Sequence, residues 1–146
     1  MYSDLLNELT ARDVIRSRNA PAGDLAEKLV GVAYGGTLAP PSQTSWDVLT
    51  PDGRQLQVKC RLTDPDRPRG NYSVFRSWDF DACVFVQLTH QYAVSRAVEV
   101  PVECLRSAAS RSEHVNGWRI QVRSALAQMA GAQDVTAMLE SAYSQL

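Results

Sequence analysis

The 146-residue sequence has few cysteines, few lysines and no long apolar run, and each shortage excludes a class of protein. The three cysteines lie far apart without CxxC spacing, which argues against a disulfide framework or a zinc site and favours buried thiols in a reducing cytoplasm. No apolar run approaches the roughly 18 residues that a membrane-spanning helix needs. The N-terminal residues also lack the basic and apolar pattern of a signal peptide. The sequence therefore predicts a cytoplasmic protein with no membrane partner.

Charge is almost balanced over the whole chain but is unevenly distributed. The formal net charge of −1 excludes a generally basic nucleic-acid coat protein. Residues 54–76 hold six basic and two acidic residues, a local charge of +4, which leaves −5 for the rest. An acidic body with one basic segment predicts a local site for a polyanion, although a solvated loop with a chance excess of arginine explains the same count. Lysine occurs only at Lys28 and Lys59, so each is a candidate for a role that requires an amine.

Residue patterns predict a single α/β domain with a mixed sheet. The length fits one compact domain, with a core at about 21–100 and a C-terminal strand and helices in residues 101–146. The segment 81–88 is apolar on both faces and should be the central strand. Helices are expected at residues 3–18 and 21–34, after Pro101 and around a break at Gly131, and strands at 46–50, 55–62, 81–88, 92–100 and 118–122.

The segment "SWDVLTPDGRQLQVKCR", residues 45–61, predicts a hairpin whose register decides which polar side chains meet. A two-residue loop would place Asp47 opposite Val58. A three-residue Pro-Asp-Gly loop would place it opposite Gln57 instead. Proline suits the first position of a type I turn and glycine the left-handed position that closes a bulge, so the three-residue loop is favoured. We therefore expect Asp47, Gln57 and a partly exposed Lys59 on one face.

This constellation has the composition of a hard-cation phosphodiesterase site. Asp47 and Gln57 supply oxygen ligands, Glu27 adds a carboxylate from the helix 21–34, and Lys59 supplies an ammonium group. The alternative is structural: Asp47 caps a strand end, Gln57 and Lys59 face solvent, and Glu27 lies on a helix surface. Spacing alone does not separate the two.

Asp47 followed after a turn by Gln57-Val58-Lys59 resembles the PD-(D/E)XK nuclease superfamily in its D…QxK form, as in Mrr-type restriction enzymes. The preceding helix "GDLAEKLV", with Glu27, resembles the first helix of restriction-endonuclease-like and Holliday-junction-resolvase-like members. The resemblance covers about residues 21–90. It implies a restriction endonuclease-like single domain with a mixed β-sheet flanked by helices.

The resemblance also implies an activity, that of a magnesium-dependent DNA endonuclease in restriction, phage defence or DNA repair, with manganese as a substitute metal. Asp47 and Gln57 would bind the metal, with the Val58 carbonyl as an extra ligand. Glu27 would assist the metal or its water, and Lys59 would act on the nucleophile or the phosphate. Gln57 departs from the pattern, because it replaces the usual acid and removes one negative charge. A catalytically inactive, nuclease-fold DNA-binding module or a regulatory, protein-interaction module is therefore the alternative.

The basic segment supplies the expected nucleic-acid contacts. Arg61, Arg67, Arg69 and Arg76 would hold the DNA backbone, with RNA as an alternative substrate. A homodimer is expected, because cutting both strands needs two sites. The segment 64–79 should be an irregular and mobile arm, since it is rich in Pro, Gly and Arg. The two histidines, His90 and His114, fall outside the predicted site.

Overall fold

The computed structural model describes the chain except for residues 1–3, 5–6, 9–10, 13–20, 44 and 122–123. Most of the helix expected at residues 3–18 therefore lies outside the described residues. Within the described part, no helix is both long enough and apolar enough to cross a membrane.

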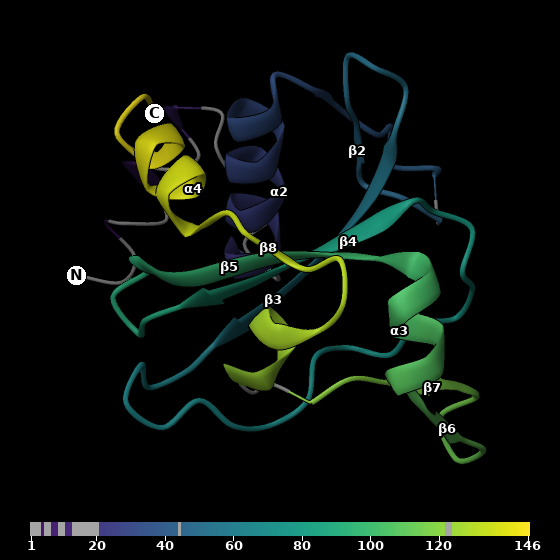
Figure 1. The fold of residues 1–146 in the computed structure, drawn as a ribbon. Helices are drawn as coiled ribbons and strands as arrows, with labels where there is room; N and C mark the ends of the chain where they lie inside the picture. The colour runs from purple at the N-terminus through teal and green to yellow at the C-terminus, as the bar shows by residue number, and fades with distance from the viewer. Residues whose placement is uncertain (1–3, 5–6, 9–10, 13–20, 44, 122–123) are drawn as a thin grey trace.

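Six strands form one mixed sheet in the order β1-β2-β3-β4-β5-β8 (Figure 1). The central pair β3 and β4 is parallel, and every other neighbouring pair is antiparallel. This confirms the predicted α/β domain with a mixed sheet flanked by helices. The strands are β1 (Thr37–Leu38), β2 (Val48–Leu49), β3 (Gln55–Leu62), β4 (Ala82–Leu88), β5 (Val94–Pro101) and β8 (Gln133–Asp134).

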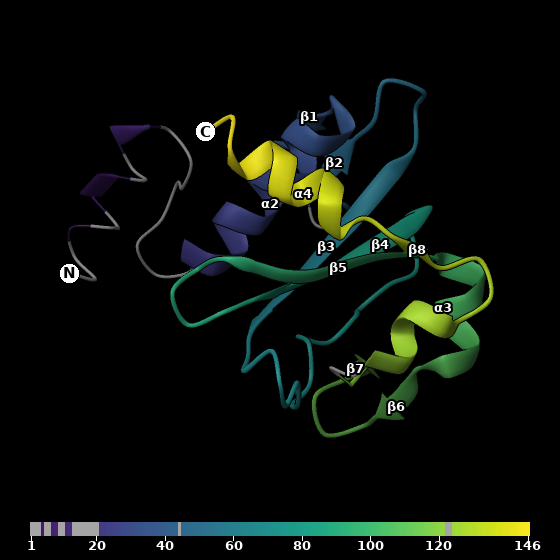
Figure 2. The ribbon, with the colours of Figure 1, turned by 60° about the vertical axis from the view of Figure 1, so that its left-hand side comes forward.

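Different elements cover the two faces of the sheet (Figures 1 and 2). Two helices, α2 (Pro21–Tyr34) and α4 (Thr136–Tyr143), cover the first face. The second face is covered by α3 (Val102–Ala108), the 3₁₀ helix η1 (Ser124–Gln128) and the hairpin of β6 (Ser110–Ser112) and β7 (Gly117–Arg119). Each face thus has its own hydrophobic core.

The central strands contribute to both cores. Every residue of β4 is buried, and its side chains alternate, with Val84 in the first core and Phe85 in the second. This confirms the predicted central strand. On β3, Leu56 and Val58 belong to the first core, so Gln57 and Lys59 lie on the opposite face, because successive strand residues alternate.

The connection between β3 and β4, residues 63–81, is called the arm here and forms part of the second layer. Tyr72 and Phe75 are 2% and 1% exposed and lie in the second core. Phe75 and Trp118 of β7 exchange backbone hydrogen bonds of 2.8 and 2.9 Å. The prediction that the arm is irregular is confirmed. The expectation that it is mobile for lack of anchors does not fit residues 71–80, because these aromatic side chains fill the second core.

Helix α2 has the bounds that the sequence predicted and ends at a glycine pair. Gly35 adopts a φ of 63°. Its N–H donates to the Val32 carbonyl (3.2 Å), and the Gly36 N–H donates to the Gly31 carbonyl (2.8 Å). These two bonds form the Schellman closure that satisfies the last carbonyl groups of a helix.

We expect Gly36→Ala to destabilise the fold, because a Cβ at this position would lie 2.6 Å from the backbone oxygen of Leu49 and 2.9 Å from Val48 Cγ1. The β1–β2 pairing would have to move, at a cost of about 1–3 kcal/mol. Denaturant unfolding measures this cost. Gly23→Ala is the matched control, since its Cβ would meet nothing within 4 Å, and an equal effect of the two changes would contradict the steric explanation.

Candidate active site

The hairpin between β2 and β3 has the predicted register. Val48 pairs with Leu56 and Leu49 with Gln55, and the Thr50 N–H donates to the Arg54 carbonyl (2.9 Å) across a three-residue turn. Gly53 adopts a φ of 90° in that turn. The prediction of a Pro-Asp-Gly loop with a left-handed glycine is confirmed.

A buried carboxylate fixes the tip of this hairpin. Glu99 of β5 is 6% exposed. It accepts a hydrogen bond from the Tyr34 hydroxyl (2.8 Å) and forms an ion pair with the Arg54 guanidinium (3.2 Å). Burial and the bond to Glu99 raise the pKa of Tyr34, so the tyrosine stays a donor. The network ties the start of β3 to α2 and β5.

The regular pairing of β2 with β3 ends at Val48, and the Asp47 side chain continues it. Asp47 Oδ2 accepts a hydrogen bond from the Val58 N–H (2.7 Å). The N–H and C=O of one strand residue leave the same edge of the strand, so the Val58 carbonyl also faces the edge beside Asp47. A carboxylate and a backbone carbonyl therefore lie side by side just before the first residue of β2.

The Gln57 side chain completes this group. Two acceptors face one atom of its amide, so we assign that atom as the nitrogen. The nitrogen then donates to the Ser45 carbonyl (3.0 Å) and to Asp47 Oδ2 (3.3 Å). The predicted proximity of Asp47 and Gln57 is thus confirmed. In this state the amide presents its nitrogen, not its oxygen, to the carboxylate.

Lys59 is held by the arm. Its Nζ donates to Ser73 Oγ (2.9 Å) and to the Val74 carbonyl (3.0 Å), and it lies 4.7 Å from the centre of the Phe75 ring. Only 7% of the residue is exposed, so the expectation of a partly exposed lysine is wrong. The arm covers the polar face of β3 and leaves the ammonium in contact with a cleft.

Burial sets the electrostatics around this ammonium. Desolvation lowers the pKa of Lys59 from its ordinary value of 10.5, while Cys83 and Asp47 act in the opposite direction. Burial also raises the pKa of the Cys83 thiol well above 9.0, so the thiol is neutral at physiological pH. A neutral thiol carries no charge to stabilise the ammonium, so Asp47 is the negative group that opposes the lowering of the Lys59 pKa.

The lowered pKa of Lys59 predicts how stability changes with pH. The unfolded chain holds the Lys59 proton more tightly than the folded chain, so stability should rise as the pH increases from the folded pKa towards 10.5. Below the folded pKa both states carry the ammonium, and the full penalty of burying it is present. Denaturant unfolding of wild type and Lys59→Met over this alkaline window isolates the effect. A stability difference that stays constant through the window would contradict it.

Gln57 and Lys59 line a cleft of about 470 Å³, called the β3 cleft here. Arg76 lines the same cleft, and its guanidinium donates to the carbonyl groups of Val115 (2.9 Å) and Asn116 (3.2 Å). Two cationic side chains thus border the cleft. Its lining consists of Ser45, Gln57, Lys59, Val74, Phe75, Arg76 and Ser77.

Glu27 lies in a different cavity from Gln57 and Lys59. It is half-buried on α2 and lines, together with Asp24 and Asp47, a cavity of about 390 Å³. Asp47 therefore contributes to this cavity while its Oδ2 bonds to β3. Among the described residues no three His, Cys, Asp or Glu side chains are grouped closely enough to hold a metal ion. A cation here would need amide and carbonyl oxygens in addition to carboxylates.

The predicted nucleic-acid arginines divide between two places. Arg76 lies at the β3 cleft. The other three, Arg61, Arg67 and Arg69, line a separate cavity of about 340 Å³ together with His90. We call this the arginine cavity. The four arginines therefore lie at two cationic positions.

Sequence reasoning missed the residues that position Lys59. Ser73, Val74 and Phe75 act on it from 14 or more residues away along the chain. The only local signal is that aromatic residues alternate with arginines in the arm, a mixture that suits either a hydrophobic core or a nucleic-acid surface. The aromatic rings of Phe75 and Trp78 stack on each other, with centroids 5.1 Å apart.

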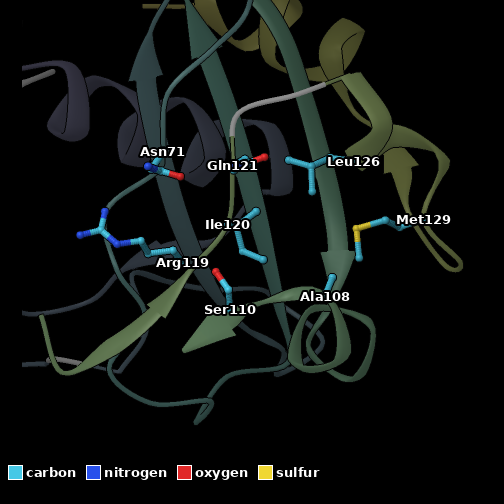
Figure 3. A pocket seen from close by; sticks show the side chains of 8 residues that line it. All are labelled: Asn71, Ala108, Ser110, Arg119, Ile120, Gln121, Leu126 and Met129. Atoms are coloured by element: carbon cyan, nitrogen blue, oxygen red, sulfur yellow. The ribbon is translucent and has the colours of Figure 1, made fainter. Parts of the chain in front are cut away.

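A further cavity of about 400 Å³ lies between the arm, α3, β6, β7 and η1 (Figure 3). Arg119 is the one charged residue among the described residues that line it. It contains none of the side chains predicted for the site. The cavity is lined by Asn71, Ala108, Ser110, Arg119, Ile120, Gln121, Leu126 and Met129.

The sequence matches no protein-family model and no curated protein. Among solved structures, the chain is similar to a bacterial homing endonuclease, I-Ssp6803I, with a TM-score of 0.49 and 15% sequence identity. The similarity covers 89% of this chain and 97% of that chain.

Proposed function

We propose that this protein is a magnesium-dependent DNA endonuclease of the restriction endonuclease-like type, with manganese as a substitute metal. The observation that supports this most is the bond between Asp47 Oδ2 and the Val58 N–H (2.7 Å). It joins the carboxylate to the Gln57-Val58-Lys59 strand, of which Gln57 and Lys59 line the β3 cleft while Asp47 lines the neighbouring cavity with Glu27.

The oxygen groups at this position suit a hard cation. The Asp47 carboxylate, the Gln57 amide oxygen and the Val58 carbonyl would hold Mg²⁺, which prefers oxygen ligands and retains several waters. Bound there, the metal would neutralise the phosphate and lower the pKa of a coordinated water. Gln57 must first turn its amide, because its nitrogen now faces Asp47. Glu27 would assist from the α2 side of Asp47 by holding a water.

Lys59 and Arg76 would act on the phosphate. An ammonium group has three donors, and the arm uses two of those of Lys59. The third would bind a phosphate oxygen or orient the attacking water, and it would stabilise the negative charge that builds during attack. Arg76, which lines the same cleft, would hold the DNA backbone. Since both strands must be cut, we further propose that two copies pair on one duplex.

A second candidate function is that of a nuclease-fold DNA-binding module without activity. The hydrogen bond that we assign from Gln57 to Asp47 favours it, because this bond satisfies the carboxylate without any cation. The site also has fewer negative charges than a site with an acid at position 57. This module would bind DNA but would show no specific response to Mg²⁺.

A cleavage assay separates the two functions. The purified protein is incubated with supercoiled plasmid, linear duplex, branched DNA and RNA, each with Mg²⁺, Mn²⁺ or a chelator. We expect DNA cleavage that requires the metal. DNA binding without cleavage of any substrate would reject the endonuclease and support the binding module. Cleavage that persists in the chelator would reject the metal site.

A further inference from the structure

The arginine cavity gathers positive charge. Arg61, Arg67 and Arg69 line it together with His90. Within the described part of the chain, none of these three guanidinium groups forms an ion pair. One carboxylate, Asp64, lines the cavity, and its Oδ1 accepts the Asp66 N–H (2.9 Å). Three guanidinium groups around one concavity make an anion site, because guanidinium pairs well with phosphate oxygens.

The backbone around this cavity is held in place. The Arg67 N–H donates to the Asp64 carbonyl (3.1 Å), and the Arg69 N–H donates to Thr63 Oγ1 (3.3 Å). Thr63 is itself buried. Gly70 has a φ of 97° and lies so close to the Arg61 guanidinium that a Cβ there would be 3.0 Å from Nη2. The arm thus fixes the direction of Arg61 and the spacing of the other two arginines.

The sheet places this cavity in line with the β3 cleft. Arg61 follows Lys59 by two residues on β3, so the two side chains leave the same face with Cα atoms about 6.7 Å apart. Because β3 and β4 are parallel and Leu62 pairs with Leu88, His90 lies just beyond the same end of the sheet. A spacing of about 6.7 Å is about the distance between neighbouring phosphate groups of one DNA strand, so the two residues can contact phosphates of the same strand.

We propose that the arginine cavity is a second phosphate site, which binds the cut strand at a phosphate close to the bond that is hydrolysed at the β3 cleft. This deepens the endonuclease proposed above and rests on it for the identity of the strand. The site sets a minimum substrate: a DNA that covers only the β3 cleft is held weakly, and a DNA that also reaches the arginine cavity is held tightly.

The test measures binding instead of cleavage, in chelator, for a series of duplexes of increasing length. Arg67→Ala and Arg69→Ala, singly and together, are compared with Arg106→Ala, which removes the same charge from an exposed position on α3. We expect each cavity variant to lower the slope of log affinity against log salt by about one for long duplexes. Each cavity variant should bind the shortest duplex as wild type does. Arg106→Ala should change neither the binding of the shortest duplex nor the salt slope for long duplexes.

Other outcomes overturn the proposal in distinguishable ways. Equal binding of long duplexes by wild type and the double variant would place the second contact elsewhere, whether or not the protein cleaves DNA. Inorganic phosphate can also be titrated against the free protein and against its complex with a long duplex. If the same phosphate concentration saturates the free protein and displaces the duplex, the cavity is a small-anion site. If the length dependence and the slope change appear but no substrate is cut, the phosphate site stands and the endonuclease fails.

Discussion

DNA cleavage by Lys59→Met should fall by at least about 100-fold, because the change removes the ammonium group that lines the β3 cleft and such groups contribute about that much or more to phosphoryl chemistry. Methionine keeps the apolar part of the side chain, without the terminal nitrogen, and can still pack against Phe75. The Val74 carbonyl, which accepts the lysine at 3.0 Å, loses its partner. We therefore expect a loss of stability of about 1–3 kcal/mol. Metal-dependent plasmid nicking and denaturant unfolding measure the two effects.

Lys28→Met is the matched control, since Lys28 on α2 is the other lysine of the chain. It should keep full activity and stability. Full activity in a folded Lys59→Met protein would reject the catalytic role of Lys59. If Lys59→Met is unfolded at the assay temperature, its loss of activity says nothing about catalysis, and Lys59→Arg, which retains a cation, becomes the test. Lys59→Arg should fold and retain measurable metal-dependent nicking, and no nicking by this folded variant would also reject a purely electrostatic role.

Gln57→Glu should make the stability of the protein depend on magnesium. The amide nitrogen that lies 3.3 Å from Asp47 Oδ2 would be replaced by a carboxylate oxygen, and two adjacent carboxylates repel each other. The metal-free variant should therefore be less stable than wild type. A bound dication relieves this repulsion, and ligand at 100 times its Kd stabilises a fold by about 2.7 kcal/mol. Thermal unfolding with and without Mg²⁺ checks the effect, and calorimetry should show tighter binding than in wild type.

The control for this change is Gln128→Glu, which adds the same charge at an exposed position of η1. Its response to Mg²⁺ should equal that of wild type. An unchanged magnesium affinity in Gln57→Glu would mean that Gln57 does not touch the metal. The same result in Asp47→Asn would remove Asp47 from the ligands as well.

Elements with strong local signals were predictable from the sequence. Helix α2 begins at Pro21 and ends at Gly35-Gly36 because both ends carry residues that fix the backbone. The hairpin register followed from Pro-Asp-Gly, because proline and glycine each allow few backbone conformations. The buried strand β4 followed from its uninterrupted apolar run.

Features that depend on distant segments were not predictable in this way. The strands β1 and β8 have two residues each, which is too short for any periodicity. The burial of Lys59 depends on Ser73 and Val74, whose approach to β3 follows from how Tyr72 and Phe75 enter the second core. In the sequence the arm has the composition of a solvated loop. Its aromatic side chains decide its position, and they do so only through tertiary packing.

The parallel pairing of β3 with β4 also has a consequence for how quickly the chain reaches its native state. No helix bridges these strands, and the whole irregular arm must close before they pair. Loop closure of this length costs entropy before any contact offsets it, and topologies rich in such pairings fold slowly. The acceptors of Lys59 lie within that loop. The hairpin of β2 and β3 can form early from local contacts, whereas the ammonium acquires its partners only when the last large loop closes. A proteolytic cut at residues 63–72 would therefore break the chain between β3 and the lysine's acceptors while every strand of the main sheet remained intact.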